Sequence, residues 1–297
     1  MTVLVVGGTG FVGGHVVHAL RAADVPVRLI ARRPEKQERF QAWGCEVVPG
    51  DMTDADSLSR AAESAEAVVH LVALPPFAKP ESIRRVMEQG TRDLVAAAKD
   101  AGVKRFVLMS ALGTSERSKD LAPYYHAKWE EEHEVTGSGI DHTIFRPSFI
   151  FGPDGGMLPG LISLTRYSPV TPSVGTKKLQ PIWVEDVAAY VTKALSSPGA
   201  ANKTFEVAGP DVITFGELNE RIRRALDKKR LAFQVPTGLL KAGAAVGSLL
   251  PPLRGAREGV AMLEFEDNVT DIGPAVEALG VQPIGLDEML RHATARS

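Results

Sequence analysis

The chain has 297 residues, and its 36 acidic and 34 basic side chains leave a formal net charge of −2. This balance gives no global electrostatic reason to bind nucleic acid or an anionic membrane surface. The single cysteine, Cys45, excludes an internal disulfide framework and a cysteine-based zinc site. The first residues lack the basic flank and cleavage site of a signal peptide, so we expect a cytoplasmic protein.

The first half of the chain alternates short, β-branched apolar runs with amphipathic stretches. The apolar runs predict strands at residues 3–6, 25–30, 46–48, 67–74, 105–109 and 142–145. The amphipathic stretches predict helices at residues 12–23, 35–43, 58–64 and 83–101, and a helix that contains 128–135. Strands that alternate with helices in this way indicate parallel βαβ units, and hence an α/β fold with a doubly wound parallel sheet.

The second half is less regular. Five glycines and five prolines in residues 152–181 are more typical of a shaped loop region than of a repeat. Helices are expected again at 183–195 and 215–226, with a strand at 204–207. We therefore predict a nucleotide-binding domain from 1–151 plus 183–209. A small discontinuous substrate cap would comprise 152–182 plus 210–297.

Residues 237–253 form the most apolar late segment. Lys241 interrupts the run and Pro251 and Pro252 end it, so it is too short for the roughly 20 apolar residues of a membrane span. Spacing of three and four residues indicates a buried or lid helix, and no transmembrane segment is predicted; the spaced residues are Leu239, Ala242, Val246 and Leu249.

A glycine-rich loop stands between the first predicted strand and the first predicted helix. Gly7, Gly10 and Gly13 give a Gly-x-x-Gly-x-x-Gly pattern in this strand-to-helix context. Glycine permits the tight turn, the close approach of a pyrophosphate to backbone N–H groups, and close helix packing. The pattern predicts a Rossmann-type dinucleotide site, with these cofactor-binding residues: Gly7, Thr9, Gly10, Phe11, Val12 and Gly13.

The end of the second predicted strand carries arginines instead of a carboxylate. A 2′-hydroxyl of NAD is usually bound by Asp or Glu at this position, but the chain has Arg32 and Arg33, with no acid before Glu35. Guanidinium groups suit a 2′-phosphate by charge and by their forked donors. We predict a preference for NADP(H) over NAD(H). The alternative is that both arginines are solvated residues at the start of a helix.

Ser110 directly follows the fifth strand, and Tyr124 and Lys128 follow it on a predicted helix. Positions i and i+4 share a helix face, so the tyrosine and lysine can reach one cleft. A neighbouring ammonium lowers the pKa of a phenol toward the range useful for acid–base catalysis, and a serine can steady the substrate oxygen. We predict Ser110, Tyr124 and Lys128 as catalytic residues. Tyr125, three residues before Lys128, is the poorer alternative.

With these motifs the chain resembles the short-chain dehydrogenase/reductase superfamily in its extended or atypical branch, which includes NAD(P)-dependent epimerases and dehydratases. The resemblance extends over nearly the whole sequence, through the glycine loop, Gly50-Asp51, His70-Leu71-Val72-Ala73, the Ser/Tyr/Lys set, Arg146–Pro153 and Trp183–Ala188. The late stretch Phe265-Glu266-Asp267-Asn268-Val269 is similar to relatives of the accessory nucleotide-binding subunit of respiratory complex I.

The resemblance implies further cofactor contacts. Asp51 would face the adenine ring, the backbone of Val72 and Ala73 would line the cleft, and Lys128 would also hold the ribose. The remaining implied contacts are Met52, Pro147 and Ser148. One departure is Gly90-Thr91, where many members place an asparagine that takes part in a proton relay. Asp186 either braces its own helix or contacts a ligand.

Other site types find little support. The histidines show no metal-binding spacing, so no metal site is predicted, and Glu130, Glu131 and Glu132 are interpreted as a solvated acidic face. We expect an NADP(H)-dependent oxidoreductase, or an epimerase or dehydratase, acting on a carbonyl or alcohol substrate or a quinone. The alternative is a non-catalytic dinucleotide-binding protein with an accessory, redox-sensing or quinone-associated role. Such a protein could be a homodimer or associate with a membrane complex.

Overall fold

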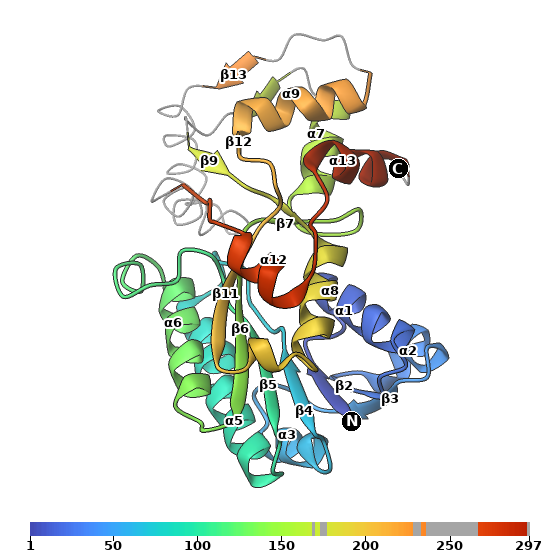
Figure 1. The fold of residues 1–297 in the computed structure, drawn as a ribbon, viewed down its shortest axis with the longest axis vertical. Helices are drawn as coiled ribbons and strands as arrows, with labels where there is room; N and C mark the ends of the chain where they lie inside the picture. The colour runs from blue at the N-terminus through green and yellow to red at the C-terminus, as the bar shows by residue number, and fades with distance from the viewer. Residues whose placement is uncertain (168–169, 173–176, 228–232, 236–266, 296–297) are drawn as a thin grey trace.

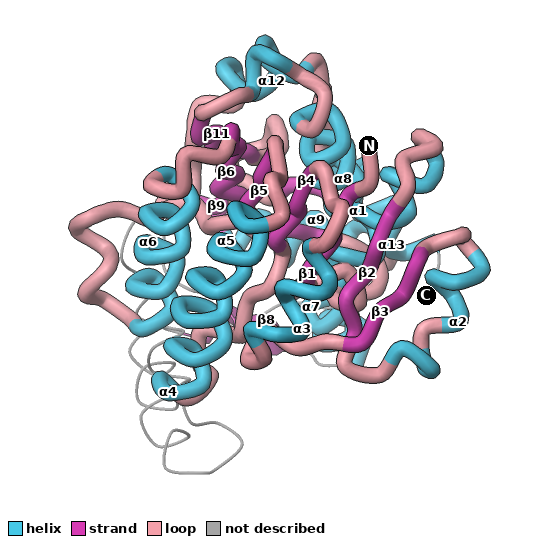
Figure 2. The backbone as a smooth tube through the Cα atoms, turned by 90° about the horizontal axis from the view of Figure 1, so that it is seen from below, coloured by secondary structure: helices cyan, strands magenta, loops and turns pink. Residues whose placement is uncertain are grey.

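The computed structural model describes residues 1–167, 170–172, 177–227, 233–235 and 267–295. Its centre is a seven-stranded parallel sheet with strand order β3-β2-β1-β4-β5-β6-β11 (Figures 1 and 2). The strands are β1 Val3–Val6, β2 Val27–Ala31, β3 Glu46–Pro49, β4 Ala67–His70, β5 Arg105–Met109, β6 Asp141–Pro147 and β11 Lys203–Val207. The order reverses between β1 and β4, which creates the crevice at which open α/β sheets bind ligands.

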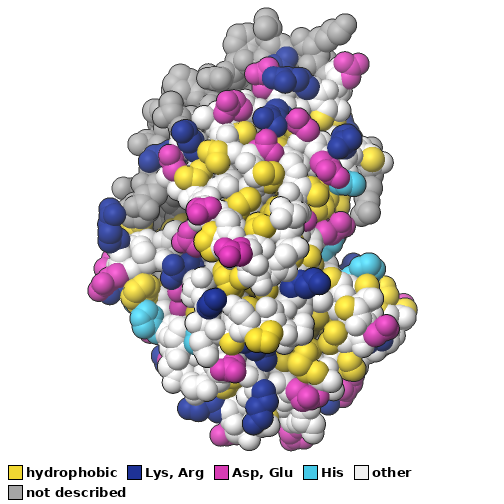
Figure 3. Space-filling model, viewed as in Figure 1, with side chains coloured by type: hydrophobic (Ala, Val, Ile, Leu, Met, Phe, Trp, Pro, Cys, Tyr) yellow, Lys and Arg dark blue, Asp and Glu magenta, His cyan; other side chains and the backbone are white. Residues whose placement is uncertain are grey.

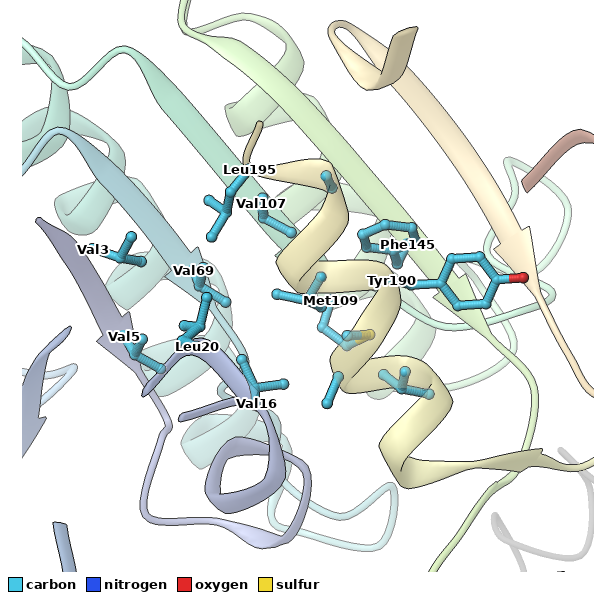
Figure 4. Packing of buried hydrophobic residues seen from close by; sticks show 14 of the residues in the cluster. Val3, Val5, Val16, Leu20, Val69, Val107, Met109, Phe145, Tyr190 and Leu195 are labelled. Atoms are coloured by element: carbon cyan, nitrogen blue, oxygen red, sulfur yellow. The ribbon is translucent and has the colours of Figure 1, made fainter. Parts of the chain in front are cut away.

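Helices cover both faces of the sheet, which confirms the predicted doubly wound fold. On one face, apolar side chains of β1, β4 and β5 pack against α1 and α8, as Figure 4 shows. On the other face, a second core forms under α3, α5 and α6. The helices are α1 Phe11–Ala22, α2 Glu38–Ala42, α3 Ala55–Ala62, α5 Gly90–Asp100, α6 Pro123–Thr136 and α8 Val184–Ala194, with short 3₁₀ turns at η1 Pro34–Lys36 and η3 Pro198–Ala200.

The long predicted helix at 83–101 is present but contains an irregular segment. Its first turn is α4 Pro80–Ile83, and a π-helical segment, η2 Arg84–Gln89, separates α4 from α5. At the junction, a Cβ added to Gly90 would lie 2.6 Å from the Met52 carbonyl oxygen, so only glycine fits there. π-Helical turns are rare and often occur at functional sites. This one packs against α6.

Segments from the range predicted for the cap, together with Phe151 and Trp183, form a third apolar core above the sheet (Figure 1). Residues 152–181, predicted as a loop region, contain the helix α7 Leu158–Tyr167, so that prediction was wrong for this part. Leu158, Ile162 and Thr165 form the buried side of α7 at helical spacing. The other elements are β7 Ile150–Phe151, β8 Val170–Pro172, β9 Lys178–Leu179, β10 Ile182–Trp183, β12 Ile213–Thr214, α9 Phe215–Ala225, β13 Phe233–Val235 and α13 Leu286–Ala295.

Helix α12, Gly273–Leu279, lies within the range predicted for the cap but packs on the sheet domain. Its Ala275 and Leu279 join the core that contains Tyr190 of α8 and Phe205 of β11. The predicted division into two domains remains a prediction. The predicted apolar helix at 237–253 lies outside the described residues.

The surface carries both signs of charge. On the face shown in Figure 3, basic and acidic side chains are interspersed over the described part of the chain. Within the described residues, no helix is both long enough and apolar enough to cross a membrane. Cys45 is buried between α2 and β3, with 7% of its surface exposed, and burial raises the pKa of its thiol.

Candidate active site

The glycine loop follows β1 and opens α1 at the crevice between β1 and β4. Gly7 has a φ of 87°, and a Cβ there would lie 2.8 Å from the Val72 nitrogen. A Cβ on Gly13 would lie 2.2 Å from the Gly7 carbonyl oxygen. Both positions therefore require glycine: Gly7 for the turn beside β4, and Gly13 for the close packing of α1 on the loop.

The N-terminus of α1 supplies backbone donors at this loop. Gly10 is the N-cap, and Phe11, Val12 and Gly13 form the first turn, where an α-helix leaves N–H groups without intrahelical acceptors. These donors and the positive end of the helix dipole suit a pyrophosphate. The side-chain-free backbone of the glycine loop and the donor set of the first turn together fit a dinucleotide.

A cavity of about 520 Å³ opens beside the loop at the end of β2. Its lining is basic and polar, with Thr9, Ala31, Arg32, Arg33, Lys36 and Gln37 around it. Both arginines were predicted from the sequence, whereas Lys36, which lies in the 3₁₀ turn η1, was not. Three basic side chains around one cavity favour the binding of an anionic group.

Asp51 lies at the rim of this region. Its carboxylate accepts hydrogen bonds from the backbone N–H and the hydroxyl of Thr53, both at 2.8 Å, and lies 3.9 Å from Arg32. Burial alone would raise the pKa of Asp51, but the Thr53 hydrogen bonds and the arginine hold it below its usual range. The carboxylate is therefore ionised and offsets part of the charge of Arg32.

The ring of Phe11 is enclosed by the loop that follows β7. A Cβ on Gly155 would lie 2.2 Å from the ring, and Gly152 and Gly156 also approach it closely. Asp154 in the same loop contacts His15 of α1 at 3.1 Å. Around these residues and α2 lies a second cavity of about 450 Å³. The cap loop thus packs directly on the helix whose N-terminus would face the phosphates.

Tyr124 and Lys128 lie together on α6, as predicted. The Lys128 ammonium is 6.0 Å from the centre of the Tyr124 ring. It donates hydrogen bonds of 2.8 Å to the Met109 carbonyl oxygen, next to Ser110, and to Glu131. The hydroxyl of Tyr125 instead points to the Leu112 carbonyl oxygen at 3.5 Å. Tyr124 is thus the tyrosine beside the lysine.

The protonation state of Tyr124 differs from the prediction. Burial raises the pKa of Tyr124 above its ordinary value and outweighs the opposing effect of the Lys128 ammonium. The expected net lowering of this pKa was therefore wrong. At neutral pH the Tyr124 phenol is protonated, which suits a proton donor.

Ser110 is buried at the end of β5 and is held by Glu132. Its hydroxyl donates a 2.5 Å hydrogen bond to one oxygen of the Glu132 carboxylate, which also accepts two bonds from Arg146, at 2.6 and 2.9 Å. Glu131 and Glu132 are only 0% and 6% exposed, so the predicted solvated acidic face is wrong at these two positions. The buried Lys128 and the partly buried Arg146 explain how two carboxylates fit beneath α6.

This network continues to the C-terminal segment. Arg146 of β6 lies 3.9 Å from Glu206 of β11, which accepts a 2.6 Å hydrogen bond from the hydroxyl of Thr270. The backbone N–H of Thr270 in turn donates to Gln180 at 2.9 Å. Polar contacts thus connect Ser110 to a segment more than 150 residues later in the chain.

The other residues implied by the resemblance occupy varied environments. Ser148 is buried, and its hydroxyl donates a hydrogen bond to the side chain of Asn268, part of the late stretch noted in the sequence. The carbonyl oxygen of Pro147 accepts from the Leu112 N–H at 2.9 Å. The Met52 side chain belongs to the core under α3 and α5, and Ala73 is exposed beyond β4. Their contacts to a cofactor stay predictions.

A buried histidine was missed by sequence reasoning. His70 ends β4, and its Nε2 lies 2.8 Å from the hydroxyl of Thr91, in the stretch where the resemblance lacks an asparagine. Burial and the nearby Lys128 ammonium lower the pKa of His70 to about 3, so its ring is neutral. A histidine at the end of an apolar strand, before the crevice, was the available signal.

The crevice and its glycine loop define a Rossmann-type nucleotide-binding protein. Residues 7–198 match the sequence profile of a family described as NAD(P)H-binding, and the chain belongs to this family. A ceramide reductase of Caulobacter vibrioides is 32% identical over 246 residues, which cover 82% of this chain and 77% of the relative. The nicotinamide dinucleotide is therefore the cofactor class of this site.

Two further matches extend over nearly the whole chain. The mitochondrial NADH dehydrogenase [ubiquinone] 1 alpha subcomplex subunit 9 of Mus musculus is 28% identical, with 98% of this chain and 80% of the relative covered. This match confirms the resemblance to the complex I subunit. The structure of an NADPH-dependent quinone oxidoreductase from Escherichia coli, complexed with NADPH, has a TM-score of 0.80 at 21% identity. It covers 98% of this chain and 99% of that protein.

Proposed function

We propose that the chain is an NADP(H)-dependent oxidoreductase that reduces a carbonyl or quinone group of a small molecule. The observation that carries the proposal is the basic cavity at the end of β2, together with the partly buried Tyr124 beside the buried Lys128, which bonds to the end of β5. Arg32, Arg33 and Lys36 would hold the 2′-phosphate. The first turn of α1 would hold the pyrophosphate.

The chemistry follows from the protonation states of the chain's own residues. A bound NADPH supplies a hydride. Tyr124, kept protonated by burial, would donate a proton to the substrate oxygen, which is the protonation state that the reductive direction starts from. Lys128 would stabilise the phenolate that remains, and Ser110 would exchange its Glu132 acceptor for the substrate oxygen. An epimerase or dehydratase would use the same three residues with transient oxidation.

A second candidate is dinucleotide binding without turnover. The hydrogen bond that occupies Ser110 favours it, because the hydroxyl donates to Glu132 and is not free for a substrate as it stands. In this role the chain would act in the cytoplasm as a homodimer, or would associate with a membrane complex like the complex I subunit it resembles.

Cofactor preference is tested by comparing the Kd of NADPH and NADH, with Arg60→Ala on the exposed face of α3 as the control. We expect tighter binding of NADPH. Replacing Arg32 and Arg33 by alanine should weaken NADPH binding roughly 10- to 100-fold, because charge-assisted hydrogen bonds are lost, and should leave NADH nearly unchanged. Equal Kd values for the two cofactors in the wild type would contradict the preference.

Turnover is tested by NADPH oxidation against a panel of carbonyls and quinones. Tyr124→Phe should lower kcat by roughly 100-fold or more, because the proton donor is removed. Tyr125→Phe makes the same change on the adjacent residue and should retain activity. Activity that survives in Tyr124→Phe removes Tyr124 from its role, and a wild-type protein that binds NADPH but reduces nothing supports the second candidate.

A further inference from the structure

The buried ion pair of Lys128 and Glu131 needs an explanation beyond packing. The two side chains are 1% and 0% exposed, and the Lys128 nitrogen lies 2.8 Å from the Glu131 carboxylate. Burying two charges costs desolvation energy that their attraction barely repays, and apolar replacements are often as stable or more so. Stability therefore does not account for the pair.

The geometry connects this pair to Tyr124. Positions 124, 128 and 131 follow i, i+4 and i+7 spacing, so their side chains lie on one face of α6. Lys128 has three N–H donors, of which one bonds to the Met109 carbonyl oxygen and one to Glu131. The centre of the Tyr124 ring lies 6.0 Å from the same nitrogen, so the third donor is the one left for Tyr124.

Glu131 has a carboxylate neighbour on the π-helical segment. Within the described residues, one oxygen of Glu131 and one of Glu88 are buried without a hydrogen-bond partner. Ionised carboxylates have acceptors only, so a proton on either group supplies the missing donor. Glu88 lies in η2, where it is half-buried, and η2 packs against α6. Glu88 is thus a partly exposed carboxyl group, on the segment that packs against α6, whose charge acts on Glu131.

Proton affinity supports this arrangement. Burial raises the pKa of Glu131 to about 7 despite the Lys128 ammonium, and the charges of Glu132 and Glu88 act in the same direction. Burial would lower the pKa of Lys128, but Glu131 and Tyr124 keep it raised, so the amine is charged at rest. On the β4 side, His70 is neutral and carries no proton charge into the cluster.

We propose that Glu131 and Glu88 form a proton path that restores the proton Tyr124 gives to the substrate. This inference rests on the proposed reductase function. The Tyr124 O–H bond breaks as the substrate oxygen is protonated, while the carbonyl carbon receives the hydride. The phenolate then takes a proton from the Lys128 ammonium. The amine takes one from Glu131, which a pKa of about 7 leaves protonated in part at neutral pH, and Glu131 is reprotonated from water through Glu88. Each carbonyl reduced consumes one proton from solvent.

Kinetics test the path with Glu131→Gln and Glu88→Gln, which keep the shape of the side chain but remove the exchangeable proton. The matched control is Glu130→Gln, one residue away on α6. We expect kcat to fall about tenfold or more with a flattened pH profile near neutrality, while the Kd of NADPH changes less than about twofold. Glu131→Asp should recover part of kcat. Wild-type kcat and pH profile in both glutamine variants would overturn the path.

The Glu88→Gln variant keeps the test valid if Glu131→Gln fails to fold. Glu88 is half-buried and is not part of the Lys128–Glu131 ion pair, so its replacement should leave the fold intact. A second measurement needs no turnover: the ultraviolet titration of the Tyr124 phenol, taken as the wild type minus Tyr124→Phe. In Glu131→Gln the pKa of Tyr124 should fall, because Lys128 then acts without a neutralising carboxylate. An unchanged titration would overturn the link.

These results separate the two proposals. A wild type that reduces no acceptor refutes the reductase function, and the titration then decides the link between Glu131 and Tyr124 alone. If the wild-type protein reduces an acceptor and both glutamine variants keep its kcat and pH profile, only the proton path is refuted.

Discussion

Two arginine–glutamate pairs of this chain differ mainly in burial. Arg146 and Glu132 form a bidentate pair under α6, whereas Arg92 and Glu134 pair at 2.8 Å on its exposed side. Exposed pairs contribute about 1 kcal/mol or less, but removing one partner of a buried pair leaves an uncompensated charge.

We predict that Arg146→Ala lowers the free energy of unfolding by about 3 kcal/mol or more, because the buried Glu132 carboxylate then lacks a cation. Arg92→Ala should cost about 1 kcal/mol or less. Urea unfolding at neutral pH measures both. Similar losses of unfolding free energy in the two variants would show that another group compensates the charge of Glu132, and would contradict the prediction.

The positions of Tyr124 and Lys128 could be predicted from sequence, but the burial of Glu131 and Glu132 could not. Helix α6 is polar along most of its length, so no apolar stripe distinguishes its inner face. The burial depends on Arg146, which approaches from β6, far away in sequence. Arg146 between the buried Phe145 and Pro147 was the one hint of a buried partner.

At the scale of elements, Asp186 joins the first turn of α8 to the segment between α12 and α13. Its carboxylate accepts a 3.0 Å hydrogen bond from the Ile284 N–H, so Asp186 braces the fold in this structure. Burial raises the pKa of Asp186 from 3.8 to about 6. A raised pKa means that the folded state binds the proton more tightly than the unfolded chain does.

The stability that this proton contributes is complete below about pH 4 and is lost as the pH rises through about 6. Asp186→Asn keeps an acceptor for Ile284 but has no ionisable proton. We predict that the stability of the wild type relative to this variant falls across that pH window. Chemical unfolding at several pH values measures the difference. Asp56→Asn, in the exposed first turn of α3, is the control, and a difference that rises with pH would contradict the prediction.

The type and order of the elements were predictable where local signals agreed, although the strand predicted at 67–74 ends at His70. The apolar runs gave all six strands predicted in the first half, and Gly102 follows the end of α5. Helix α7 was missed because Pro159 and Gly160 lie in its first turn. Proline is tolerated at the start of a helix, but a Pro-Gly pair in a sequence is typical of a loop. The π-helical turn η2 depends on packing against α6 and on the close contact at Gly90, which no local pattern encodes.

At the scale of the whole molecule, the sheet domain and the cap share several chain crossings and direct contacts. The loop around Phe11 and the bond between Ser148 and Asn268 connect cap segments to the nucleotide site. We predict a single cooperative transition in calorimetry. NADPH at 100 times its Kd should add about 2.7 kcal/mol and raise the Tm by roughly 5 °C or more.

Two separate transitions, with only one shifted by NADPH, would contradict this coupling. The Arg32→Ala/Arg33→Ala variant is the control, because its Tm should respond far less to NADPH at the same concentration. The sheet topology was predictable because each βαβ unit is local. The cap contacts were not, because they join residues such as Ser148 and Asn268 that lie 120 positions apart.

The buried thiol of Cys45 gives the protein an internal reporter. It is the only sulfhydryl in the chain, and it is covered by α2 beside the edge strand β3. Because a buried thiol of raised pKa reacts slowly, alkylation during native-state incubation would time the opening of this edge, without any engineered label. A second cysteine placed on the cap could then be labelled selectively at the surface, so that a dye there follows the cap while Cys45 follows the sheet.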